Sequence, residues 1–115
     1  MTNIYHAAIP DDWERARLDG EYRVSTRGVG LEEQGFIHWS YEHQVADVAN
    51  RFYRDVDELV LLRIDPTRLD RNVIDEAPAD GGDELFPHVY GPIPVGAVVS
   101  VTVWRRGGDG RYSLR

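Results

Sequence analysis

The 115-residue chain contains no cysteine and no lysine. The absence of cysteine excludes disulfides, thiolate nucleophiles, iron–sulfur clusters and cysteine-based zinc sites. The absence of lysine excludes a Schiff-base mechanism and the lysine of a phosphate-binding loop. No run approaches the ~20 apolar residues that a membrane-spanning helix needs. The first residues also lack a charged leader followed by an apolar stretch, so we expect a cytoplasmic protein that does not enter a membrane.

Positive charge is scarce as well. The chain has 13 arginines and 20 acidic residues, which gives a formal net charge of −7 at pH 7. Such a field repels phosphate backbones, so we do not expect broad nucleic-acid binding. A local group of arginines can still hold a small anionic ligand, which leaves a nucleotide-like molecule as the expected partner.

The order of apolar segments predicts one α+β domain over residues 1–115. We expect a folded core over residues 1–104 and a charged, Gly-rich tail over residues 105–115 that is flexible unless something ties it down. Strands are predicted at residues 4–9, 22–26, 36–39, 59–64, 72–76, 86–90 and 97–104. Because strands and helices do not alternate regularly, the sheet is expected to be antiparallel or mixed, with two main helices.

Both helices carry recognisable start or stop signals. Pro10 predicts the start of the first helix and Gly20 its end, with Trp13 and Ala16 on its inner side. Ser40 is predicted to be the N-cap of the second helix. One apolar stripe of helical spacing follows it, made of Val45, Val48, Ala49, Phe52 and Tyr53.

Three histidines, His6, His38 and His88, each end a short apolar run. Histidine has an ordinary pKa near neutrality and can donate, accept or ligate. Three such rings in a small domain predict a shared polar site. The alternative for any single one is a half-buried histidine whose hydrogen bonds are satisfied by the fold.

Two polar side chains share strand faces with these histidines. Ser40 lies two residues after His38, and Tyr90 lies two residues after His88, so each pair is expected on one face. An imidazole next to a phenol suits a ribose or phosphate together with a planar base. Glu76 flanks the Gly-rich loop 77–83 and could supply a carboxylate to this site, as could Glu84 on its other side.

Metal and hydrolase motifs are absent from the sequence. Three histidines can hold zinc with water in the fourth position. However, no H-x-H, H-x-x-x-H or H-E-x-x-H pair occurs, and His38 and His43 are five residues apart, so the spacing gives no support to a metal site and no metal ligand is assigned. The chain also lacks the G-x-S-x-G elbow of serine hydrolases and the G-x-G-x-x-G loop of dinucleotide-binding folds.

At these residues the chain resembles the bacterial family known as domain of unknown function 952. The resemblance covers almost the whole chain, and its F-P-H-x-Y-G-P string is the most specific part. Gln34 replaces the usual Glu of the family, and the connector over residues 25–34 is longer than usual. The matching segments are Ile4-Tyr5-His6, residues 34–40, residues 44–53, residues 59–65, Glu76 and residues 86–92.

The layout is similar, more distantly, to ADP-ribosyltransferase-like folds, including the RNA 2′-phosphotransferase branch. That similarity implies that His6 contacts the ribose or phosphate of a nicotinamide nucleotide. It implies that His38 and Ser40 line the same cleft and that Tyr90 stacks on a base. Glu76 would stabilise an oxocarbenium-like centre, as carboxylates do in glycosyl transfer.

The expected function is therefore enzymatic, acting on NAD or an ADP-ribose derivative by group transfer or N-glycosidic cleavage. NAD would be a substrate, and no other cofactor is expected. Two alternatives stay open, a non-catalytic ligand-binding or accessory domain on the same scaffold and a metal-dependent hydrolase using the histidines. The expected catalytic residues are His6, His38 and Glu76, and the expected substrate-binding residues are Ser40, His88 and Tyr90.

Overall fold

The centre of the fold is a three-stranded antiparallel sheet. A computed structural model describes residues 2–78 and 81–114. In this sheet β6 (Glu58–Ile64) lies between β1 (Ile4–Ala8) and β10 (Val98–Arg105). Leu62 packs into a core cluster on one face and Leu59 into a second cluster on the other. The strand predicted at residues 59–64 is therefore the central one, and it is covered on both faces.

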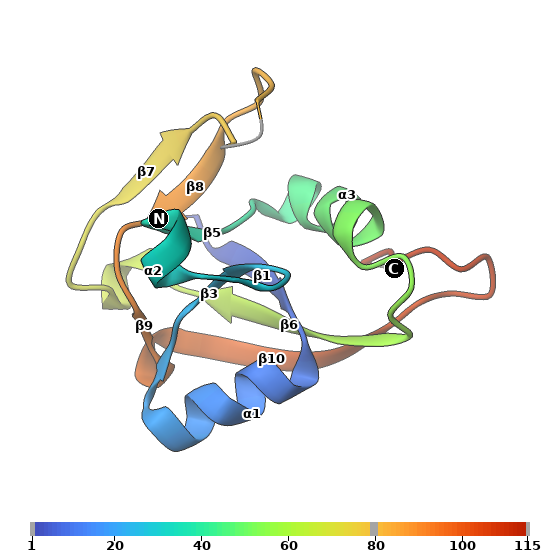
Figure 1. Cartoon of the computed structure of the whole chain (residues 1–115), viewed down its shortest axis with the longest axis horizontal. Coiled ribbons are helices and arrows are strands. Elements are labelled where there is room, and N and C mark those ends of the chain that lie inside the picture. Colours follow the sequence, from blue (N-terminus) through green and yellow to red (C-terminus); the bar gives the residue numbers. More distant parts are fainter. Residues whose placement is uncertain (1, 79–80, 115) are drawn as a thin grey trace.

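The two main helices cover opposite faces of this sheet (Figure 1). Trp13 of α1 (Pro10–Asp19) packs with β6 on one face, and Val45 of α3 (Glu42–Phe52) packs on the other. Gly20 ends α1 at φ 91°, a left-handed conformation that glycine adopts without a steric penalty. A single turn, α2 (Leu31–Gln34), is added to the two predicted helices. No helix of the described chain combines the length and the apolar content needed to cross a membrane.

A second three-stranded sheet carries most of the predicted site residues. Its order is β5 (Ile37–His38), β8 (Phe86–Val89) and β7 (Val73–Glu76). An isolated bridge between Tyr5 and Ser40 joins this sheet to β1. All strand pairs among the described residues are antiparallel, so the α+β class is confirmed. Short 3-10 turns occupy Pro66–Arg68 and Val95–Ala97.

Residues 22–26 do not form the single strand that was predicted. The chain instead forms β2 (Glu21–Tyr22), which pairs with β9 (Ile93–Pro94), and β3 (Val24–Thr26), which pairs with β4 (Val29–Gly30). The two halves bind different partners and therefore belong to different sheets. The β3–β4 hairpin also places residues 29–30, for which no strand was predicted, in a strand.

The predicted cap of the second helix is wrong by one residue. The backbone of Ser40 pairs with that of Tyr5 at 2.7 and 2.8 Å, which keeps Ser40 extended. Tyr41 is the N-cap residue, and its N–H donates to the side-chain oxygen of Gln44 at 3.0 Å. Helix α3 therefore begins at Glu42.

The carboxyl-terminal segment contacts the rest of the domain. The sequence predicted a flexible tail unless such contacts hold it. Tyr112 is buried and its ring lies 5.0 Å from that of Trp104. The side chain of Asn50 accepts from the N–H of Tyr112 at 2.7 Å and donates to its carbonyl oxygen at 2.9 Å. Residue 115 of this tail, and residues 79 and 80 of the predicted loop 77–83, lie outside the described residues.

Candidate functional site

Strand register brings two of the three histidines together. His38 of β5 pairs directly with His88 of β8, and His88 pairs with Ile74 of β7. Residues that are opposite or two positions apart share a face of an antiparallel sheet. Glu76 therefore lies diagonally across from His88 on the same face. This register places a carboxylate and two imidazoles side by side.

These three side chains form a continuous hydrogen-bonded chain, called here the Glu76–His88–His38 chain. The His88 Nδ1 atom lies 3.0 Å from Glu76 Oε1, and the His88 Nε2 atom lies 3.2 Å from His38 Nδ1. His88 is 1% exposed, and Phe36 stacks on its ring at 4.0 Å between centroids. The central imidazole is thus held on both nitrogens and on one ring face.

Tyr90 joins the outer end of this chain. Its hydroxyl donates to Glu76 Oε1 at 2.5 Å. This hydrogen bond favours the ionised carboxylate, so it lowers the pKa of Glu76, with a smaller contribution from His88. The same contact raises the pKa of Tyr90. Glu76 is therefore held as a carboxylate that accepts from both neighbours.

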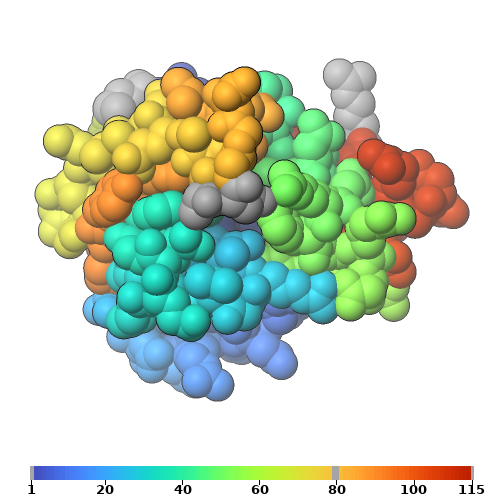
Figure 2. All heavy atoms as spheres, turned by 45° about the horizontal axis from the view of Figure 1, so that its top comes forward, coloured from blue at the N-terminus to red at the C-terminus, as the bar shows by residue number. Residues whose placement is uncertain are grey.

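A cavity of about 250 Å³ adjoins the inner end of the chain, where His38 forms part of its wall. Its lining residues come from α3, the segment from β3 to β5, and the chain around β8, which surround one region of the face seen in Figure 2. Neither Glu76 nor Tyr90 belongs to its described lining, and neither does His88. Three aromatic and three charged side chains contribute to the wall, namely Phe36, Phe52, Phe86, Asp47, Arg51 and Glu84.

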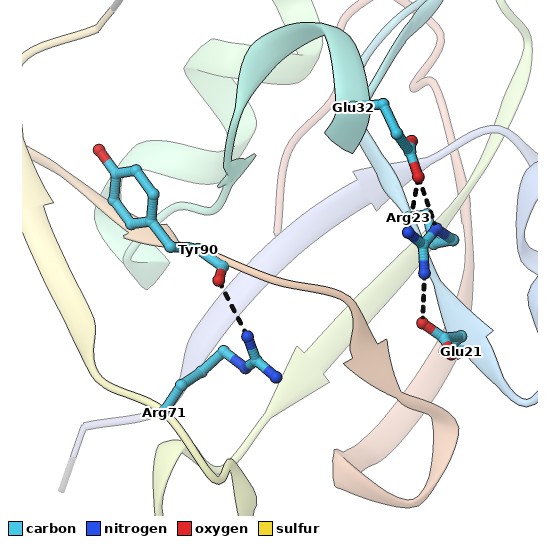
Figure 3. A network of polar contacts seen from close by, with 5 residues as sticks. All are labelled: Glu21, Arg23, Glu32, Arg71 and Tyr90. Carbon is cyan, nitrogen blue, oxygen red and sulfur yellow. Dashed lines mark hydrogen bonds and ion pairs between the residues drawn. The ribbon is translucent and has the colours of Figure 1, made fainter.

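Arg71 holds the backbone that carries Tyr90. Its guanidinium donates to the Tyr90 carbonyl oxygen at 3.0 Å, and the Tyr90 ring points away from it (Figure 3). The next residue, Gly91, is buried, and a Cβ atom at this position would collide with the Arg71 guanidinium. The glycine of the Y-G-P string therefore allows this close approach.

Replacing Gly91 with alanine is expected to lower the free energy of unfolding by about 1 kcal/mol, because Arg71 must swing away and lose its hydrogen bond. Urea denaturation measures this change. In an Arg71→Ala background the same replacement is expected to cost almost nothing. An undiminished cost there would show that the guanidinium is not what the new methyl group meets.

His6 lies on β1, is buried, and does not belong to the described lining of the main cavity. Its Nδ1 lies 2.8 Å from the His38 carbonyl oxygen, and its Nε2 lies 3.0 Å from the Tyr22 hydroxyl. Because a carbonyl only accepts, Nδ1 carries the proton and Nε2 accepts from Tyr22. Burial lowers the pKa of His6 to about 4. His6 thus holds the backbone of His38 as a neutral ring.

Ser40 lies with His6 and does not belong to the described lining of the main cavity. It is 2% exposed, and both residues line a separate hollow of only about 10 Å³. His38 borders this hollow as well as the main cavity. Of the six predicted site residues, the structure therefore links His38, His88, Glu76 and Tyr90 in one chain of side chains. His6 and Ser40 lie behind it.

Sequence reasoning missed two phenylalanines of the cavity wall and the glutamine that holds Glu84. Phe36 and Phe86 each lie two positions before a site histidine, so strand alternation could have placed them on the same face. Gln44 is 4% exposed, and its amide donates to Glu84 and to the Leu85 carbonyl, each at 2.9 Å. Nothing local in the sequence indicates the contact between Gln44 and Glu84, because 40 residues separate them.

No group of three or more histidine and acidic side chains within residues 2–78 and 81–114 is arranged to hold a metal ion. The two adjoining imidazoles bond each other, and the third donates to a backbone carbonyl. The described site is therefore one of hydrogen bonds and aromatic contacts.

Comparison with known proteins gives a family and a fold. The family described as protein of unknown function, DUF952, matches residues 8–101. The crystal structure of protein CC0527 from Caulobacter crescentus is similar over 98% of this chain and 95% of that one, with 29% identity and a TM-score of 0.83. The solution structure of the same protein gives 30% identity, coverages of 99% and 94%, and a TM-score of 0.80. No protein with a curated description matches. With most of its length matched, the chain belongs to the DUF952 family.

Proposed function

We propose that this protein is an enzyme that cleaves or transfers across the N-glycosidic bond of a nucleotide-type substrate, NAD or an ADP-ribose derivative. One observation carries the proposal. The Glu76–His88–His38 chain ends at a cavity with aromatic walls, so an oriented imidazole adjoins a space for a small ligand. Pockets that combine apolar walls with a few converging polar groups are characteristic of ligand sites.

The hydrogen bonds of the chain define what His38 can do. The Glu76 carboxylate only accepts, so His88 donates from Nδ1. With both rings neutral, His88 Nε2 then accepts from His38 Nδ1, and His38 Nε2 is the nitrogen that can take up a proton. A proton gained there is stabilised through His88 by the negative charge of Glu76. His38 is therefore the general base and acid, whereas His88 and Glu76 are positioning residues.

In the proposed reaction, the bond between ribose C1′ and the nitrogen of the base breaks. Both bonding electrons go to the departing base. Water or an acceptor hydroxyl forms the new bond to C1′, and its proton passes to His38. Positive charge develops on the ribose as the base departs, and preorganised carboxylates favour such a transition state.

The cavity size supports binding of one part of a nucleotide. Its volume of about 250 Å³ lies below the ~300–1,000 Å³ that drug-sized ligands occupy. A base with part of its ribose matches this space better than a whole dinucleotide does. The rings of Phe36, Phe52 and Phe86 suit a planar base.

The distant similarity to ADP-ribosyltransferase-like folds is part of this proposal, as is a cytoplasmic location, but two of its residue roles change. Glu76 orients His88 at the outer end of the chain instead of facing the reacting sugar. Base stacking falls to the phenylalanines of the cavity instead of Tyr90, whose hydroxyl is engaged with Glu76. Binding without catalysis is the second candidate, favoured by the absence of Glu76 from the cavity lining.

The proposal is tested by incubating the protein with NAD and following released nicotinamide by chromatography. Calorimetry with NAD and ADP-ribose measures binding in parallel. We expect release by the wild type and by a His43→Gln control, because His43 is exposed and lies outside the cavity lining. Binding without release would favour the non-catalytic candidate. Neither binding nor release with either nucleotide would overturn both.

A further inference from the structure

We propose that the cavity is a binding site for a planar organic cation, with Glu84 as the partner of the positive charge. The identity of the cation, the pyridinium ring of a nicotinamide nucleotide, rests on the proposed function. A cation site favours NAD over ADP-ribose as the substrate, because ADP-ribose has no pyridinium ring. The site itself follows from the cavity wall, one feature at a time.

The first feature is the fixed position of the Glu84 carboxylate. Gln44 donates from Nε2 to Glu84 Oε2 at 2.9 Å and to the Leu85 carbonyl at 2.9 Å. Its Oε1 atom accepts from the Tyr41 N–H at 3.0 Å. With its amide engaged at three points and 4% exposed, Gln44 has no freedom to turn. Glu84 is thus held at the cavity wall by a buried side chain that is anchored to the start of α3.

The second feature is the charge of the wall. Asp47 and Glu84 contribute two carboxylates and Arg51 one guanidinium, which leaves a formal charge of −1 for the described charged lining. The guanidinium of Arg51 lies 5.2 Å from the centre of the Phe52 ring. The cavity wall therefore already holds one planar cation against an aromatic ring. Because two carboxylates outweigh one guanidinium in this described lining, the wall favours a cation over an anion.

The third feature is the set of aromatic faces. Phe36 is stacked on His88, and Phe86 lies 4.7 Å from His38 between ring centres. Both rings are held by these contacts and both line the cavity. Aromatic faces attract cations within ~6 Å of the ring centre, more strongly where water is excluded. A flat cationic ring gains from this attraction and from Glu84 together, and a neutral ring of the same shape gains only the apolar contact.

The test compares two ligands that share a ring and differ in charge. Calorimetry is performed with 1-methylnicotinamide, a cation, and with nicotinamide, which is neutral. We expect the wild type to bind the cation about tenfold more tightly. In Glu84→Gln this preference should nearly disappear. Glu33→Gln removes the same charge from an exposed position outside the cavity lining and should keep the preference.

A second variant addresses the positioning of Glu84. Gln44→Met removes the amide that holds the carboxylate, and it should weaken binding of the cation much more than binding of nicotinamide. In a Glu84→Gln background the same replacement should affect both ligands alike, because the charge that Gln44 positions is gone. An equal loss for both ligands in the wild-type background would assign Gln44 a structural role only.

The outcomes separate this inference from the proposed function. Equal affinity for both ligands, no binding of either, or an unchanged preference in Glu84→Gln would overturn the cation site. Cleavage of NAD would still support the enzyme in those cases. Conversely, a charge preference that depends on Glu84, in a protein that leaves NAD intact, would support the cation site and overturn the enzymatic function.

Discussion

Replacing His38 with glutamine is expected to lower kcat for NAD cleavage by about 10³-fold, within the ~10²–10⁴ that a positioned acid–base group contributes. His38 is the histidine that borders the cavity, and glutamine cannot take up a proton at neutral pH. Its amide can still hydrogen-bond to His88. The KM should change little, because the aromatic walls that receive the base remain. Initial rates of nicotinamide release over a range of NAD concentrations measure both constants.

The outer residues of the chain are expected to matter less than His38. Glu76→Gln removes the charge that stabilises a protonated imidazole but leaves His38 in place, so a smaller fall in kcat should follow. Thermal unfolding of each variant shows whether the fold is retained. If His38→Gln cleaves NAD at the wild-type rate, the proton-transfer role assigned to His38 is wrong. If Glu76→Gln matches the loss in His38→Gln, Glu76 does more than orient His88.

The elements with strong local signals were predicted correctly from the sequence. Pro10 and Gly20 bound α1 as expected, because proline tolerates the first turn and glycine the left-handed end. The strand predicted at residues 59–64 is β6, which begins one residue earlier, at Glu58. The predicted cap at Ser40 failed because Tyr5, 35 residues earlier in the chain, pairs with its backbone. Long-range pairing outweighed a local preference there.

The candidate site was only partly predictable for the same reason. Alternation correctly placed His88 and Tyr90 on one face, since both bond Glu76. The contact between His38 and His88 depends on the register of β5 against β8, which no local pattern sets. The order of the tail was unpredictable for the same reason, because Tyr112 is held by Asn50, 62 residues away in the chain. Glu84 was named from the sequence as a possible carboxylate of the site, but its contact with Gln44, 40 residues earlier in the chain, was not.

His6 shows the limit of reasoning from residue type. A histidine at the end of an apolar run was expected to belong to a shared polar site. The similarity to ADP-ribosyltransferase-like folds implied that His6 contacts the ribose or phosphate of a nucleotide. Both of its nitrogens are instead used inside the domain, by Tyr22 and by the backbone of His38. The ring is neutral because burial lowers its pKa to about 4. Its expected contribution is therefore to stability, and that contribution depends on pH.

We expect the free energy of unfolding to fall by about 2 kcal/mol between pH 7 and pH 5 through His6 alone. The unfolded chain takes up the proton near pH 6.5, whereas folded His6 takes it up near pH 4. Between these values the unfolded state binds more protons, so stability decreases as the pH falls. The full difference corresponds to about 3 kcal/mol and is reached below pH 4. Urea denaturation at several pH values measures the slope.

A His6→Gln variant isolates this effect, because glutamine can donate to the His38 carbonyl and accept from Tyr22 but does not titrate. The variant should be less stable at pH 7 and lose about 2 kcal/mol less than the wild type on going to pH 5. Carboxylates with lowered pKa values, such as Glu76 and Asp55, lose their contribution only at more acidic pH. Restricting the comparison to pH 5 and above therefore leaves them ionised. If the free energy of unfolding has the same pH dependence in both proteins, His6 is not buried as a neutral ring. Its assignment to the interior, away from the ligand, would then be wrong.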